Sequence, residues 1–194
     1  MRQQIRQEIS SIAPFDALER DDINNCLAWV DSGVALCRVA KPATPPIHLV
    51  AYFAVVDDGH VLLVDHRNAQ LWLPTGGHVD PGEHPRVTVA RELQEELGFA
   101  APHAIAAPLF VTVTTTVGLT AGHTDVSLWY VVRASRQQHI TFDEREFKGI
   151  RWFPFDQVPW QRSDPQLQRF LSKLRSVESP PVKSTRNTGI RRWN

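Results

Sequence analysis

The stretch from Gly77 to Phe99, GHVDPGEHPRVTVARELQEELGF, constrains the fold of this chain more than any other feature. Pro85 suits the first position of a helix, where no backbone N–H is missed, and Gly98 suits the position just past the end. At about 100° per residue, Ala90, Leu93 and Leu97 fall on one stripe. The sequence therefore predicts an amphipathic helix with an apolar back between Pro85 and Gly98.

The other stripe of this helix carries Glu92, Glu95 and Glu96 at spacings i, i+3 and i+4. Like charges at these spacings repel each other by about 0.2–0.5 kcal/mol per pair. A hard divalent cation offsets this repulsion, because Mg²⁺ prefers carboxylate oxygens and commonly also carries substrate phosphates. Arg91 can pair with Glu83 or Glu95 and fix a carboxylate rotamer. Taken alone, such charges are more often a solvated helix face.

The spacing favours the metal site over a solvated face. Gly77 is followed after five residues by Glu83, and after seven more by the run RELQEELGF from Arg91 to Phe99. This pattern resembles the signature box of the Nudix hydrolase superfamily at every specified position, and a chance match is on the order of one in ten million. The resemblance implies an α/β fold, a Nudix-type α/β/α sandwich with a mixed β-sheet, over roughly residues 47–176.

The resemblance also implies roles for individual residues. Arg91 and Glu83 correspond to a supporting salt bridge. Relatives commonly place a further carboxylate, a metal ligand or general base, in a loop that matches Glu146, with Glu144 as the reserve. Whether Glu146 or Glu92 accepts the proton of the attacking water stays open. The metal ligands implied by the resemblance are the backbone carbonyl of Gly76 and the side chains of Glu92, Glu95, Glu96 and Glu146.

Together these roles imply a pyrophosphohydrolase that cleaves a phosphoanhydride bond of a nucleoside diphosphate linked to a variable group. Mg²⁺ is the expected cofactor, with Mn²⁺ as a substitute, and the nucleophile is a metal-activated water. No signature of the NADH, coenzyme A or dinucleoside polyphosphate branches is found, and Pro108 lies closer to the box than the proline associated with ADP-ribose enzymes. The default substrate is therefore a nucleoside triphosphate or related nucleotide. The alternative is a non-catalytic Nudix-like module that binds a nucleotide, but such a module is expected to lose box carboxylates, and none is missing here.

Three further residues are candidates for substrate binding. Arg67 follows a predicted strand, where relatives often carry a basic residue that reaches the substrate, although a lone Arg there is more often solvated. His78 stands where Lys or Arg is common, and the hard oxygen site expected nearby argues against a metal role for it. Tyr52 can stack on the organic half of the substrate or belong to the core. His123 and Asp125 can line the cleft, but a surface turn pair is the commoner fate of such residues.

Hydrophobic periodicity predicts the remaining elements of the sheet. The nearly continuous apolar run from His48 to Val56 is typical of a strand covered on both faces, and Asp58-Gly59 turns it into a hairpin. Alternation over residues 109–117 predicts a half-exposed strand. A C-terminal helix after Asp164-Pro165 is expected to cover one sheet face through Leu167, Phe170, Leu171 and Leu174. The predicted strands are 48–56, 61–64, 109–117, 125–133 and 150–153.

Residues 1–46 are interpreted as a helical extension with a Pro-rich connector, 47–178 as the Nudix domain, and 179–194 as a basic tail expected to be disordered. Ile5, Ile9 and Ile12 predict one amphipathic helix, and Asp21 or Asp22 is the expected cap of a second. The extension can serve as a substrate lid, as a dimer contact, or simply as packing.

Composition limits the partners. Lys and Arg number 21 and so do Asp and Glu, so no bulk attraction to nucleic acid or anionic membranes is expected. No segment approaches the roughly 20 apolar residues of a membrane span. Cys26 and Cys37 are expected to be reduced thiols in a cytoplasmic protein. The expected partner is a small nucleotide, bound by a monomer or homodimer.

Overall fold

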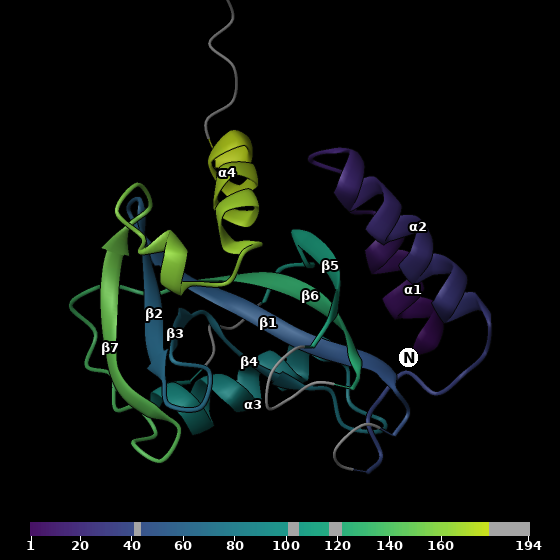
Figure 1. Cartoon of the computed structure of the whole chain (residues 1–194), viewed down its shortest axis with the longest axis horizontal. Helices are drawn as coiled ribbons and strands as arrows, with labels where there is room; N and C mark the ends of the chain where they lie inside the picture. Colours follow the sequence, from purple (N-terminus) through teal and green to yellow (C-terminus); the bar gives the residue numbers. More distant parts are fainter. Residues whose placement is uncertain (41–43, 101–104, 117–121, 179–194) are drawn as a thin grey trace, which may run out of the picture.

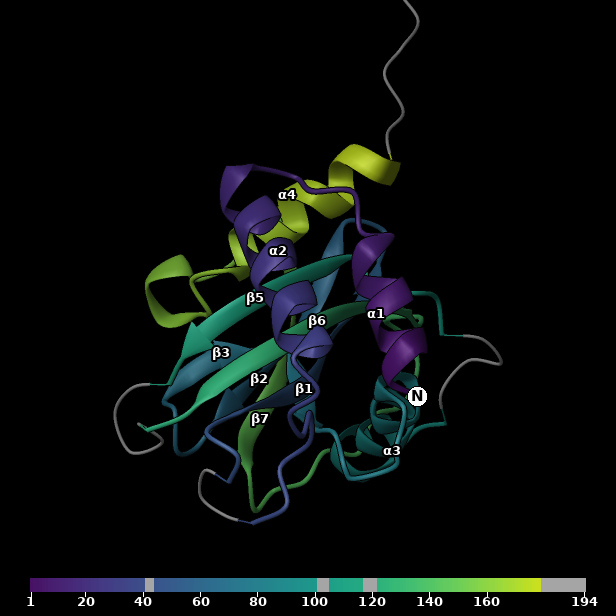
Figure 2. The ribbon, with the colours of Figure 1, turned by 90° about the vertical axis from the view of Figure 1, so that its right-hand side faces the viewer.

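The computed structural model describes residues 1–40, 44–100, 105–116 and 122–178. Within these residues, seven strands form one mixed sheet with the order β3-β2-β1-β6-β5, in which β4 also pairs with β1 and β7 with β2. Helices α3 and α4 lie on opposite sides of the sheet, while α1 and α2 lie beside its β5 edge (Figures 1 and 2). The expected α/β/α sandwich with a mixed sheet and N-terminal helices is confirmed. The predicted tail from residue 179, and part of the connector, lie outside the described residues.

Two helices begin the described chain, α3 lies between β4 and β5, and α4 follows the last strand. The helices are α1 (Arg2–Ser10), α2 (Ala17–Asp31), α3 (Pro85–Leu97) and α4 (Leu167–Glu178), with a short 3₁₀ helix at Trp160–Arg162. The strands are β1 (Ile47–Asp57), β2 (His60–His66), β3 (Leu71–Leu73), β4 (Thr75–His78), β5 (Phe110–Thr115), β6 (Thr124–Arg133) and β7 (Phe147–Pro154).

Strand β1 is the centre of the sheet. It pairs in parallel with β6 from Ile47 opposite Thr124 to Val56 opposite Arg133, and it forms the predicted hairpin with β2. The turn between β1 and β2 uses Asp58 and Gly59, both at positive φ, as two-residue hairpin turns require. Most side chains of β1 are buried on both faces, which confirms the reading of its apolar run.

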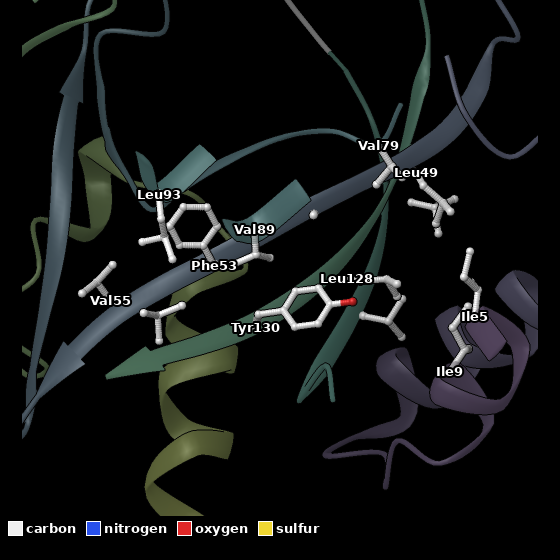
Figure 3. Close-up of a cluster of buried hydrophobic side chains, with 14 of the residues drawn as sticks. Ile5, Ile9, Leu49, Phe53, Val55, Val79, Val89, Leu93, Leu128 and Tyr130 are labelled. Carbon is white, nitrogen blue, oxygen red and sulfur yellow. The ribbon is translucent and has the colours of Figure 1, made fainter. Parts of the chain in front are cut away.

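Two hydrophobic cores lie on the two faces of the sheet. Figure 3 shows the first, in which Phe53, Leu93 and Tyr130 form part of a continuous cluster that reaches Ile5 and Ile9 of α1. The second lies under α4, where the four predicted apolar residues of that helix are all buried. Each face of the sheet is therefore covered, as an α/β sandwich requires.

The prediction of a half-exposed strand at 109–117 is wrong for the first half of β5. Phe110 and Thr112 are buried because α4 covers their face, with the Phe110 ring 6.2 Å from that of Phe170. The Thr112 hydroxyl accepts a hydrogen bond from the Trp129 indole at 3.0 Å. Polar residues on this face thus mark a satisfied buried contact and not exposure to solvent.

The N-terminal extension begins its second helix earlier than predicted. Asp16, and neither Asp21 nor Asp22, is the N-cap of α2, with its carboxylate accepting from the Glu19 N–H at 2.8 Å. Glu19 reaches back to accept from the N–H of Phe15 at 2.6 Å. The arrangement resembles a capping box, except that Glu19 accepts from the residue before the N-cap, and the two contacts fix the start of the helix more strongly than a lone Asp.

The extension is bound to α4 by charged side chains. Lys173 of α4 donates to Glu19 at 2.7 Å, and both side chains are almost fully buried, at 4% and 0% exposed. Beside them Arg169 forms two hydrogen bonds to Asp16, at 2.6 and 2.8 Å. In this structure the helices of the extension therefore pack on the sandwich.

Neither thiol forms a disulfide, since Cys26 and Cys37 are both free. Among the helices that the structure describes, none combines the length and apolar character needed to cross a membrane.

Candidate metal and phosphate site

Helix α3 runs from Pro85 to Leu97 as predicted. The His84 ring caps its N-terminus by accepting from the Arg86 N–H at 3.2 Å, and Gly98 ends it in the left-handed conformation at φ 68°. Val89, Leu93 and Leu97 form the buried stripe, while Ala90 is only half-buried at its edge. The helix is held by this stripe against β1, which leaves the glutamate stripe facing a pocket.

That pocket has a volume of about 280 Å³ and lies between α3 and the loop before β7. Its lining joins the three box glutamates to residues from 50 positions further along the chain, so the acidic helix is not a plain solvated face. Glu144, the reserve candidate, does not line it. The lining residues are Glu92, Glu95, Glu96, Asp143, Arg145 and Glu146.

Glu96 is the most buried carboxyl group in this pocket. Its side chain is 8% exposed, and its Oε2 has no hydrogen-bond partner among the described residues. Burial, followed by the charges of Glu92 and Glu146, raises the pKa of Glu96 to about 9. Burial likewise raises the pKa of Glu92, although Arg91 opposes it. An orphaned buried oxygen among several carboxylates fits a hard divalent cation, which would keep the group ionised.

Arg91 organises the carboxylates around the pocket. It lies 3.1 Å from Glu83 Oε2, 2.7 Å from Glu92 Oε1 and 3.3 Å from Glu95 Oε2. Burial of Glu83 is outweighed by hydrogen bonds from Arg91 and Thr88, so the pKa of Glu83 is lowered and it stays ionised. Arg91 therefore holds Glu92 in one rotamer, with Glu83 as its own anchor.

Two glycines let β4 approach this helix and β1 closely. A Cβ on Gly77 would overlap the carboxylate of Glu92. A Cβ on Gly76 would lie 2.6 Å from the Ala51 carbonyl oxygen and 2.9 Å from the Tyr52 Cα, both backbone atoms. The Gly76 backbone, a candidate metal ligand, is thus fixed against β1 at a distance that only glycine allows.

Gly76→Ala is expected to destabilise the protein by about 1–3 kcal/mol, because the clash is with backbone atoms that cannot rotate away. Gly149→Ala is the matched control, since a Cβ there meets nothing within 4 Å. Urea unfolding of both variants measures the difference. Equal stability of the two variants would contradict the close approach of β4 and β1.

The predicted substrate contacts lie outside the acidic pocket. Arg67 donates through its backbone N–H to the Glu146 carbonyl at 2.9 Å and through Nε to the Glu144 carbonyl at 2.8 Å, so it holds the loop that carries Glu146. Tyr52 is half-buried with its ring edge-on to Trp129, 4.5 Å between centroids. His78 lies at the end of β4 in a separate cluster.

This separate cluster consists of His48, His78, His123 and Asp125. The expectation of a surface turn pair for His123 and Asp125 is wrong, because His123 is 8% exposed and the Asp125 side chain 23%. The two residues face inward because they flank the first residue of β6 beside the start of β1, where Asp125 is the register partner of His48.

Sequence reasoning missed two groups of residues here. Asp143 and Arg145 line the acidic pocket, with the Arg145 Nε 2.9 Å from Asp143 Oδ1, and an acidic loop near Glu146 was the only signal for them. His48 was read only as the start of a strand. Its contact with Asp125 depends on a parallel pairing of strands far apart in sequence, which no local pattern shows.

Comparisons with known proteins identify the family of this chain. A model of the NUDIX domain matches residues 47–174. The chain is similar to the MutT NUDIX hydrolase from Burkholderia pseudomallei, with a TM-score of 0.55 and 25% identity over 66% of this chain and 98% of that one. No curated protein matches.

Two other solved structures share the fold. A NUDIX-family hydrolase from Clostridium perfringens has a TM-score of 0.51 and 19% identity, over 67% of this chain and 97% of its own. The NUDIX domain of Shewanella oneidensis NrtR, solved with ADP ribose, has a TM-score of 0.54 and 19% identity, over 77% and 92%. The fold and the family match define a hydrolase that acts on acid anhydrides. The chain belongs to the Nudix family.

Proposed function

We propose that this chain is a Mg²⁺-dependent pyrophosphohydrolase that cleaves a phosphoanhydride bond of a nucleoside diphosphate derivative. The observation that carries the proposal is the buried Glu96 carboxylate, with its unpartnered oxygen beside Glu92 and Glu146. Carboxylates crowded in this way are stable together when a cation lies among them. The small pocket that they line suits a hydrated cation with phosphate oxygens.

The metal would be held by Gly76 through its carbonyl and by the carboxylates of Glu92, Glu95, Glu96 and Glu146. Bound Mg²⁺, or Mn²⁺ in its place, neutralises phosphate charge and supplies an activated water at neutral pH.

Side chains of this chain orient the carboxylates, accept the proton and pair with the phosphate. Arg91 keeps the Glu92 carboxylate oriented, and Arg67 positions the loop of Glu146 through its two carbonyl contacts. Glu92 and Glu146 line the same pocket, so either can accept the proton of the attacking water. Arg145, at the rim of the pocket, can pair with a phosphate oxygen.

The size of the pocket bears on the substrate. At about 280 Å³ it is close to the lower end of the range for small-molecule sites, so it suits a diphosphate group with the nucleoside extending outside. The ADP ribose bound to the NrtR domain, itself a nucleoside diphosphate derivative, supports this ligand class. A nucleoside triphosphate or related nucleotide remains the default substrate.

Two free thiols suit a cytoplasmic location.

The test is a substrate panel with the full-length chain after EDTA treatment. Nucleoside triphosphates, ADP-ribose, nucleotide sugars and dinucleoside polyphosphates are incubated with and without Mg²⁺, and release of phosphate or pyrophosphate is measured. At least one substrate is expected to turn over, and only when Mg²⁺ or Mn²⁺ is present. If nothing turns over while one nucleotide raises the melting temperature, the chain is a nucleotide-binding module and the proposal fails.

A further inference from the structure

The cluster of His48, His78, His123 and Asp125 draws its members from three strands. His48 is at the start of β1, Asp125 at the start of β6 with His123 just before it, and His78 is the last residue of β4. Figure 3 shows Leu49 and Val79 side by side in the core. Because side chains alternate along a strand, His48 and His78 project to the other side of the sheet. The cluster shares no residue with the acidic pocket.

The distances in this cluster approach those of a tetrahedral metal site. Asp125 Oδ1 lies 3.3 Å from His123 Nε2, 3.4 Å from His48 Nε2 and 3.9 Å from His78 Nε2. All four ligand atoms lie within 4.8 Å of one another. Ligands about 2.0–2.1 Å from a tetrahedral Zn²⁺ are roughly 3.4 Å apart, so side-chain movements of about 1 Å would complete the site.

Two of these atoms are buried without a hydrogen bond. His48 is fully buried, and neither its Nε2 nor Asp125 Oδ1 has a hydrogen-bond partner in the part of the chain that the structure describes. Buried polar atoms are almost always satisfied, so a missing ligand is the direct explanation for the pair.

In two of the rings, Nδ1 points away from the cluster and already has a hydrogen-bond partner, as in metal-bound histidines. His48 Nδ1 lies 2.9 Å from the Pro45 carbonyl oxygen, so this nitrogen carries the proton and donates. His123 Nδ1 lies 3.3 Å from the Thr116 hydroxyl, whose one proton is donated to the His123 carbonyl at 3.0 Å, so Nδ1 is the donor to the hydroxyl oxygen. Both Nε2 atoms are then left with lone pairs directed at the cluster, which is the tautomer that metal-bound histidines adopt.

Arg38 is a nearby cation that opposes metal entry. Its Nη1 lies 3.2 Å from His78 Nε2. Arg38 is only half-buried in the segment between α2 and β1, so it can swing into solvent when a metal takes its place. The ligand set of three imidazoles and one carboxylate favours Zn²⁺ over the Mg²⁺ of the acidic pocket.

We infer that His48, His78, His123 and Asp125 form a second metal site, which binds Zn²⁺ in a closed tetrahedral shell. Four protein ligands leave no open position, so the role of the ion is structural. It joins the starts of β1 and β6 to the end of β4, two residues beyond Gly76. Zinc therefore stabilises the strand that supports the catalytic pocket.

The test uses the full-length chain without added histidine residues, stripped with EDTA and titrated with Zn²⁺ by calorimetry in saturating Mg²⁺. We expect binding of one equivalent and a melting temperature raised by several degrees. His123→Gln and Asp125→Asn should each weaken binding by at least about 100-fold. The exposed His139→Gln is the matched control and should bind zinc as the wild type does.

Two further measurements keep the test decisive. Glu96→Gln, which alters the acidic pocket, should leave zinc binding unchanged, so the outcome does not depend on the proposed hydrolysis. Co²⁺ substitution of the wild-type protein should give the intense visible absorption of a tetrahedral site, and this needs no folded variant. Absence of zinc binding, equal binding by the His123 and His139 variants, or an octahedral Co²⁺ spectrum would overturn the inference.

Discussion

Glu96→Gln is expected to lower Mg²⁺-dependent hydrolysis by more than about 100-fold while making the metal-free protein more stable. The carboxylate is buried, has an unpartnered oxygen and faces two like charges. Because its pKa is about 9, metal-free Glu96 is protonated at neutral pH, and folding costs the free energy of that protonation. A neutral amide of the same shape removes this cost, which is worth about 1–3 kcal/mol in free energy of unfolding at neutral pH. The same change removes a ligand, so the stabilisation of the wild type by Mg²⁺ should largely vanish. Steady-state kinetics and urea unfolding in EDTA and in Mg²⁺ measure both effects.

Glu178→Gln is the matched control for this experiment. Its carboxylate pairs with Arg133 at the end of α4, on the other face of the sheet, and it should behave as the wild type in Mg²⁺-dependent hydrolysis. Hydrolysis by the Glu96 variant at the wild-type rate would show that the metal is held elsewhere. A lower free energy of unfolding of that variant in EDTA would show that the buried Glu96 does not destabilise the metal-free protein.

Lys173→Met is expected to destabilise the protein by about 3–5 kcal/mol, because it leaves the Glu19 carboxylate buried without its charged partner. The two side chains are 2.7 Å apart and almost fully buried between α2 and α4. Such a loss is a large part of the 5–15 kcal/mol free energy of unfolding that is typical of a folded domain. Detachment of the N-terminal helices should therefore be detectable. Chemical unfolding followed by circular dichroism gives the free energy.

The double variant Lys173→Met with Glu19→Gln provides the critical comparison. It should recover most of the lost stability, because no uncompensated charge remains and the Gln carbonyl can still accept from the Phe15 N–H. The exposed pair of Arg6 and Asp31 is the surface control, and Arg6→Ala should leave the free energy of unfolding close to that of the wild type. A double variant as unstable as Lys173→Met alone would mean that packing, and not charge, holds the extension.

The acidic helix could be predicted in detail because its signals are local. Pro85, Gly98 and the glutamate spacing all act within a few turns of one helix. The resemblance to the Nudix box supports the same helix independently. The same holds for the hairpin at Asp58-Gly59. The start of α2 was misplaced because three aspartates compete as caps, and only the return contact of Glu19 selects Asp16.

Features that depend on distant pairing could not be predicted. The burial of Phe110 and Thr112 follows from α4, which comes more than 50 residues later in the sequence. The histidine cluster follows from the register of β1 and β6, which sets His48 opposite Asp125 across 77 positions. A single sequence contains the residues of such contacts but not their alignment.

The two contacts of Arg67 with the loop before β7 bear on how this protein can change over evolutionary time. Both acceptors are main-chain carbonyls, those of Glu144 and Glu146. Recognition of the main chain does not depend on side-chain identity. The side chains at positions 144 and 145 can therefore be exchanged without losing the main-chain contacts that position residue 146.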